Sequence, residues 1–190
     1  LGVPWASGDR LGQALMGLSL LGVAGILVYK GFVYAASRAI PFWNTPLLPP
    51  LYIAYALRGG IALLFVLGAA LGRTFEAESA RAIELWVVLS TAILLFFYLA
   101  VMMNAGVTTA ESIRQLVRGR ISVAFYGGAV LVGLVVPVAV GLAGYFSPPP
   151  TGLLAVVGLA SLVGDFYVKY SISKAGIYVP LTGTFPARAR

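Results

Sequence analysis

The chain has 190 residues, of which 60% are hydrophobic and only 10% are charged. A soluble domain carries roughly 25% charged residues, so this composition indicates an integral membrane protein. The net charge of +7 does not indicate nucleic-acid binding, because the basic residues lie at the ends of apolar runs and in short loops. Cysteine and histidine are absent, which excludes disulfides, Cys-ligated iron–sulfur clusters, His-ligated haem and the usual type of zinc site. We expect no metal in this chain.

Five apolar runs are each near or above the roughly 20 residues that a helix needs to cross a membrane. They lack the alternation of a barrel strand, so the fold class is all-α, a polytopic transmembrane helix bundle. Pro137 predicts a kink in the fourth run, since an interior proline removes a helix hydrogen bond. Residues 1–190 are expected to form a single domain with spans at residues 11–36, 47–71, 83–107, 121–146 and 152–179.

A segment with four prolines, residues 37–50, connects the first two spans. Proline fixes φ and keeps the residue before it out of the helical region, so the segment is a shaped turn rather than a flexible loop. Arg38, Pro41, Trp43 and Asn44 are its candidate residues for docking a partner or for fixing how two helices meet.

Arg58 lies near the middle of the second span, where a charge costs at least about 2.5 kcal/mol on insertion scales. We therefore expect it to face the bundle interior or a watery cavity, with Tyr55 on the same helix face. Two interpretations stay open. Arg58 is bonded to backbone carbonyls or paired across helices, or it belongs to a proton path, a quinone site or an anion site.

Glu84 opens the predicted third span. A carboxylate at a helix N-terminus is favoured by the helix dipole, so capping electrostatics is the simpler interpretation. A place in a quinone site or a proton path is the alternative.

Residues 108–120, after the third span, fit a short amphipathic helix. Ile113 and Leu116 share one face, whereas Arg114 and Arg118 share another. This pattern predicts an interfacial helix with its charges in solvent or at lipid headgroups, or else a docking surface for a partner subunit.

Asp165 and Lys169 are four residues apart in the fifth span, so they can pair on one helix face. A neutralised structural ion pair is one interpretation, and a proton relay is the other. Asp165 is also a candidate partner for Arg58 on a neighbouring helix.

The distribution of lysine and arginine predicts the orientation, because these residues collect on the cytoplasmic side. One side holds Arg38, Arg114, Arg118, Arg120, Lys174, Arg188 and Arg190. The other holds Arg10, Arg73 and Arg81, diluted by Glu76 and Glu78. We therefore expect a multi-pass membrane protein with the proline-rich turn and the C-terminus facing the cytoplasm.

Two motifs resemble a known family. Residues 39–49, AIPFWNTPLLP, resemble the PFWNTPLLP segment of the polysulfide reductase membrane-subunit family (NrfD/PsrC-like). Residues 162–170, LVGDFYVKY, followed by Lys-Ala-Gly at 174–176, are similar to that family's last-span pattern. The order and separation of the motifs match the second half of a member, and the resemblance spans residues 11–179.

The resemblance implies a membrane subunit without catalytic residues of its own. Such a subunit exchanges electrons between menaquinone or another quinone and an iron–sulfur partner, which connects to a molybdopterin catalytic subunit. The family binds no haem, and some members are proposed to move protons. The candidate quinone or proton-path residues are Arg58, Asp165, Lys169, Tyr55 and Glu84.

Two features depart from the family. Members have about eight or more spans, so a chain of five spans that begins at Leu1 is expected to be processed or to lack an N-terminal part. Since the earlier spans build most of the family's quinone pocket, we expect most of that pocket to be missing here. Arg58 and Asp165 also occupy positions that we expect to be small in most members. Two other function classes therefore stay open, namely a proton-conducting or transport module without redox contact and a purely structural membrane anchor.

Overall fold

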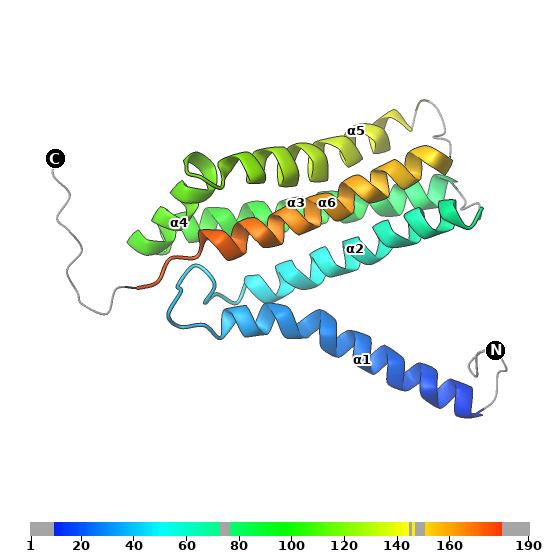
Figure 1. Ribbon diagram of the computed structural model, residues 1–190, viewed down its shortest axis with the longest axis horizontal. Coiled ribbons are helices and arrows are strands. Elements are labelled where there is room, and N and C mark those ends of the chain that lie inside the picture. Colours follow the sequence, from blue (N-terminus) through cyan, green and yellow to red (C-terminus); the bar gives the residue numbers. More distant parts are fainter. Residues whose placement is uncertain (1–9, 73–76, 145, 147–150, 180–190) are drawn as a thin grey trace.

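The computed structural model describes residues 10–72, 77–144, 146 and 151–179. Within these ranges the chain is helical and contains no strand, which confirms the all-α prediction. Figure 1 shows the helices running back and forth in one bundle. They are α1 (Arg10–Ala35), α2 (Leu48–Ala70), α3 (Ala77–Asn104), α4 (Val107–Arg118), η2 (Ala124–Val135), α5 (Val136–Ala143) and α6 (Thr151–Ala175).

Five helical segments are long and apolar enough to cross a membrane, as predicted: Arg10–Ala35, Leu48–Ala70, Ala82–Asn104, Ala124–Ala143 and Gly152–Ala175. The largest differences from the predicted bounds are at two ends. Helix α3 begins at Ala77 rather than at residue 83, because backbone hydrogen bonding continues past the apolar run. Helix α6 ends at Ala175 rather than at residue 179, and Gly176 follows it, as glycine commonly follows a helix.

The fourth span differs from the prediction in its backbone. Its first part, η2, is a π-helix, and Pro137 lies at the first positions of α5, where the two helix types join. The irregularity predicted at Pro137 is thus a change of helix type, whereas the predicted kink stays a prediction. Proline is tolerated at such a start because it needs no amide hydrogen there. It cannot donate to the carbonyl of Gly133, four residues earlier, and this leaves that oxygen available to another donor.

Helices α2 and α6 form the centre of the bundle and pack against each other more extensively than any other pair. Helix α6 also packs on η2, and α2 packs on α3 and α1. In Figure 1, α1 diverges from the bundle toward its N-terminal end. Its large apolar side chains are mostly exposed, as expected for a helix that faces lipid or another protein.

Helices η2 and α6 approach each other very closely at Gly133 and Gly164. A Cβ atom built on either glycine would overlap the backbone of the other. Small residues allow transmembrane backbones to come this close, and dispersion contacts then hold the helices together. This contact brings the carbonyl of Gly133 into the interior of the bundle.

The polar end of the bundle contains the proline-rich turn, α4 and the C-terminal end of α6 (Figure 1). Helix α4 is amphipathic as predicted, with Ile113 and Leu116 buried and Arg114 and Arg118 exposed. Arg38, Arg120 and Lys174 are exposed in the same polar end. Of the charges used to predict the orientation, Arg73, Glu76, Arg188 and Arg190 lie outside the described residues, as do the side chains of Glu78 and Arg81.

Candidate functional site

Arg58 is the largest fully buried side chain in the described part of the chain, with 2% of its surface exposed. Its Nη1 lies 3.2 Å from Asp165 Oδ1 of α6. Its Nη2 donates to Ser161 Oγ at 3.1 Å and to the carbonyl of Gly133 in η2. Arg58 therefore makes both contacts of the structural interpretation, the backbone carbonyl and the ion pair across helices.

Glu84 joins this network from α3. Its side chain is 3% exposed, and its Oε1 accepts a hydrogen bond of 2.6 Å from Ser161 Oγ. The capping interpretation is wrong, because α3 begins at Ala77 and Glu84 lies two turns into the helix. Ser161 thus connects Glu84 to Arg58, and we call Arg58, Glu84, Ser161 and Asp165 the buried polar cluster.

The buried polar cluster has two carboxyl groups for one guanidinium. It carries a net charge of −1 if both carboxyls are ionised, and a net charge in the membrane interior is costly. Glu84 Oε2 and Asp165 Oδ2 are buried and accept no hydrogen bond from the described residues. Buried polar atoms are usually paired, so these oxygens are places where a proton or a water molecule can bind.

Two other predicted residues lie around the buried polar cluster. The Arg58 guanidinium carbon lies 5.8 Å from the centre of the Tyr55 ring, a distance suited to a cation–π contact. Lys169 does not form the predicted ion pair within the described part of the chain, because Asp165 turns toward Arg58. Lys169 instead lines a cavity of about 220 Å³ between α1, α2 and α6, together with Tyr29, Lys30, Val33, Tyr34 and Tyr52.

Sequence reasoning did not assign Ser161 or Gly133 to the site, although both carry a local signal. Ser161 lies one turn before Asp165 and therefore on the same face of α6. Gly133 lies four residues before Pro137, so its carbonyl loses its usual α-helical donor. Polar side chains in register with a buried acid, and carbonyls four residues before a proline, are thus useful signals in an apolar span.

The proline-rich turn connects three helices. Trp43 Nε1 donates to the carbonyl of Ile172 in α6 at 2.9 Å, and Asn44 Nδ2 donates to that of Ala35 at the end of α1 at 2.5 Å. Tyr98 of α3 donates to the carbonyl of Phe42 at 2.6 Å. These bonds satisfy carbonyls that the turn and the helix ends leave open.

The candidate residues of the turn differ in exposure. Pro41 is half-buried, whereas Arg38 is exposed and can contact lipid or a partner. Trp43 lies against Gly176, where a Cβ atom would come within 2.6 Å of the indole ring. The turn therefore fixes helix positions through Trp43 and Asn44.

Replacing Trp43 with phenylalanine should lower the free energy of unfolding by about 1 kcal/mol, because the carbonyl of Ile172 loses its donor while an aromatic ring remains. The thermal unfolding midpoint in detergent measures this effect. The matched control is Trp86→Phe, since Trp86 is 70% exposed. Equal shifts in the two variants would show that the bond to Ile172 contributes nothing.

Comparisons with a family model and with curated proteins point to the same family. A family model described as "Polysulphide reductase, NrfD" matches residues 6–180. The chain is 28% identical to a polysulfide reductase subunit of Wolinella succinogenes over 158 residues, which cover 80% of this chain and 50% of the relative. It is 24% identical to an NrfD homolog of Haemophilus influenzae over 157 residues, which cover 78% of this chain and 48% of that relative.

The chain therefore spans about half the length of the curated relatives it matches. No significant match was found among solved structures. The family model covers nearly the whole chain, including the proline-rich turn and the buried polar cluster. The chain belongs to the NrfD polysulphide reductase family.

Proposed function

We propose that this chain is part of the membrane subunit of a quinone-linked respiratory oxidoreductase in a prokaryotic cytoplasmic membrane. The name of the Wolinella relative describes one subunit of a larger enzyme, polysulfide reductase. The partners are then an iron–sulfur subunit and, through it, a molybdopterin catalytic subunit. The quinone, menaquinone or another type, is a diffusible substrate that exchanges its electrons with the partner's nearest cluster.

The observation that carries this proposal is the pair of carboxyl groups buried with one arginine at the centre of the bundle. Reduction of one quinone takes up two electrons and two protons, and oxidation of a quinol releases them. Protonatable groups inside the membrane are expensive, and they mark proton relays and substrate paths in membrane proteins. Glu84 and Asp165 supply such groups on either side of Ser161.

The cavity beside Lys169 provides a suitable place for the quinone ring. Tyr34, Tyr52 and Lys169 supply aromatic walls and hydrogen-bond donors, the combination that recognises a flat ring with carbonyl oxygens. Lys169 lies one helical turn from Asp165, so the cavity adjoins the buried polar cluster along α6. Tyr29 and Lys30 of α1 complete its lining.

The roles of the residues follow from these positions. Lys169 and the two tyrosines bind and orient the ring, and Asp165 holds or releases a proton near it. Ser161 donates to Glu84 and accepts from Arg58, so it connects Glu84 to the arginine that pairs with Asp165. Arg58 keeps the cluster close to neutral and holds Asp165 in place.

Replacing Asp165 with asparagine tests this proposal in the assembled complex. We expect quinol-linked turnover to fall about 100-fold, the lower end of what a positioned proton donor contributes. Turnover of the catalytic subunit with a soluble electron donor should not change, because that reaction bypasses the membrane subunit. The matched control is Glu111→Gln, which removes a carboxylate from the surface helix α4.

Unchanged quinol turnover and proton uptake in Asp165→Asn would refute the proton role. A photoreactive quinone analogue supplies the second measurement. If it blocks turnover but labels other subunits only, the chain is a structural anchor. If proton conduction persists without any redox partner, the transport interpretation is favoured instead.

A further inference from the structure

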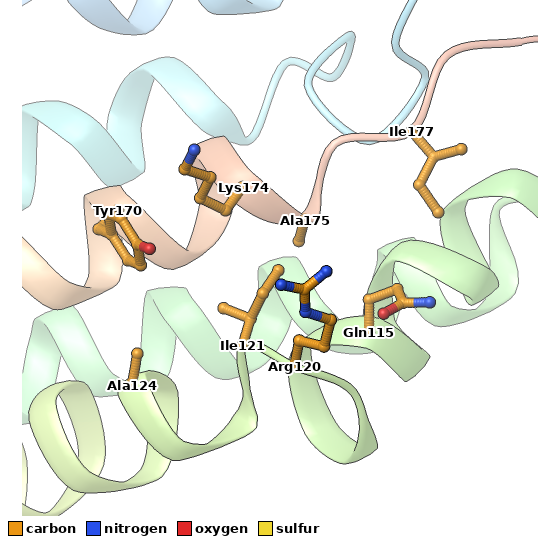
Figure 2. A pocket seen from close by; sticks show the side chains of 8 residues that line it. All are labelled: Gln115, Arg120, Ile121, Ala124, Tyr170, Lys174, Ala175 and Ile177. Atoms are coloured by element: carbon orange, nitrogen blue, oxygen red, sulfur yellow. The ribbon is translucent and has the colours of Figure 1, made fainter.

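A larger cavity, of about 510 Å³, opens at the polar end of the bundle between α4, the start of η2 and the C-terminal end of α6. Figure 2 shows its lining residues: Gln115, Arg120, Ile121, Ala124, Tyr170, Lys174, Ala175 and Ile177. Two of them are basic and none is acidic. This cavity is separate from the one beside Lys169 and from the buried polar cluster.

The positive charge of the cavity is not neutralised by the described residues. Neither Arg120 nor Lys174 forms an ion pair with them, and both side chains are exposed. The single acidic residue of α4, Glu111, is bound by Arg114 at 2.8 Å and by the Gln115 amide at 3.1 Å. The cavity therefore offers an unopposed charge of +2 to an anion.

An apolar groove of about 590 Å³ continues from this cavity along the outer side of η2 and α6. The two spaces share Arg120 and Ala124. The rest of the groove is apolar apart from one tyrosine, with Val123, Gly127, Gly128, Val132, Val163 and Tyr167 as its lining. Gly127 leaves open space, because no atom lies within 4 Å of the position that its Cβ would take.

We propose that the cavity and the groove together bind one anionic phospholipid. Its phosphate lies between Arg120 and Lys174, and one acyl chain lies in the groove along η2 and α6. A basic pocket between transmembrane helices at a membrane face is a typical headgroup site. Two other ligands fit less well. A free anion would leave the apolar groove empty, and a quinone carries no negative charge to pair with Arg120 and Lys174.

The side chains in Figure 2 fit this arrangement. The Arg120 guanidinium points toward Ala175 at the end of α6, and the Tyr170 hydroxyl adds a donor on the same side. Lys174 comes from the same helix end, and its ammonium points away from Arg120 in Figure 2, so its flexible four-carbon stem must turn toward the cavity to reach the phosphate. A lipid held in this way bridges α4, η2 and α6, and this role does not depend on electron transfer.

The test is titration of the full-length protein in detergent with phosphatidylglycerol or phosphatidylcholine, with bound lipid counted by native mass spectrometry. The double variant Arg120→Ala/Lys174→Ala should bind phosphatidylglycerol about 30-fold more weakly, at roughly 1 kcal/mol for each basic side chain. Arg118→Ala is the matched control, because Arg118 is exposed on the same end but does not line the cavity.

A second variant, Gly127→Leu, fills the groove and leaves both charges in place. It should weaken phosphatidylglycerol binding about tenfold, since each buried methylene contributes about 0.8 kcal/mol. Gly22→Leu is its control, because Gly22 also faces open space but lies on α1. Thermal unfolding of each variant shows whether the bundle remains intact.

Three results would overturn the proposal. Equal binding of the two lipids by the unchanged protein would exclude a headgroup site. An equal loss in Arg118→Ala would show general surface attraction instead of a site. If inorganic phosphate displaces the lipid fully and Gly127→Leu has no effect, the cavity takes a free anion, with no place for an acyl chain.

Discussion

Replacing Arg58 with leucine should lower the free energy of unfolding of the bundle by about 3 kcal/mol or more. The change leaves Asp165, Ser161 and the carbonyl of Gly133 without their cationic partner inside an apolar interior. A buried acid without its partner costs far more than the ion pair contributes, because water cannot replace it. Reversible unfolding in mixed micelles measures the difference.

A second substitution separates the ion pair from simple packing. In Arg58→Leu/Asp165→Leu the Asp165 carboxylate that Arg58 paired is gone as well, while Glu84 stays buried and bonded to Ser161, so stability should recover in part, by about 2 kcal/mol relative to Arg58→Leu. Arg58→Lys retains the charge but loses the planar guanidinium that contacts both α6 and η2. Its free energy of unfolding should lie between those of the unchanged protein and Arg58→Leu. If the double variant is as unstable as Arg58→Leu, the contact with Asp165 does not hold α2 to α6.

Replacing Gly164 with leucine is expected to cost about 3 kcal/mol, the upper range for overpacking. A side chain at this position would overlap the backbone of Gly133, so η2 must move away from α6. That movement also withdraws the Gly133 carbonyl from Arg58, so the packing cost and the loss of a buried hydrogen bond act together. The apparent unfolding midpoint and the yield of assembled complex report the effect.

The control for this substitution is Gly25→Leu on α1, where no atom lies within 4 Å of the added Cβ position. This variant should unfold like the unchanged protein. Should Gly164→Leu also leave stability unchanged, the two helices would not depend on their close approach. A reduced yield with normal stability of the purified remainder would point to assembly with a partner subunit as the step affected.

The spans and the inward direction of Arg58 were predictable because their causes are local in the sequence. A run of about twenty apolar residues is sufficient for a helix to cross the hydrocarbon core, whatever surrounds it. A charge in the middle of such a helix must avoid lipid, so Arg58 faces the interior in any stable packing. The amphipathic helix α4 follows from spacing in the same way.

The capping interpretation of Glu84 and the predicted ion pair of Asp165 with Lys169 were wrong for different reasons. The start of α3 was predicted from the start of the apolar run, but the helix begins several residues earlier, at Ala77. Glu84 was therefore wrongly placed at a helix end. The spacing of Asp165 and Lys169 permits an ion pair, but Asp165 forms its ion pair with Arg58 of another helix instead. A π-helix leaves no simple signal, so the role of Pro137 at a junction became visible only with Gly133 beside Arg58.

The sequence by itself determined that the chain is an all-α membrane protein, that Arg58 faces the interior and, through the proline-rich turn, which family it resembles. The spans and the inward charge depend on transfer free energies and helix spacing, and the resemblance depends on a short motif, so each is set within one segment. Only the tertiary structure decided that Arg58, Glu84, Ser161 and Asp165 share one network, and that Trp43 fixes the end of α6. Partners on different helices depend on how closely the backbones approach, and glycine contacts such as Gly133 with Gly164 set that distance.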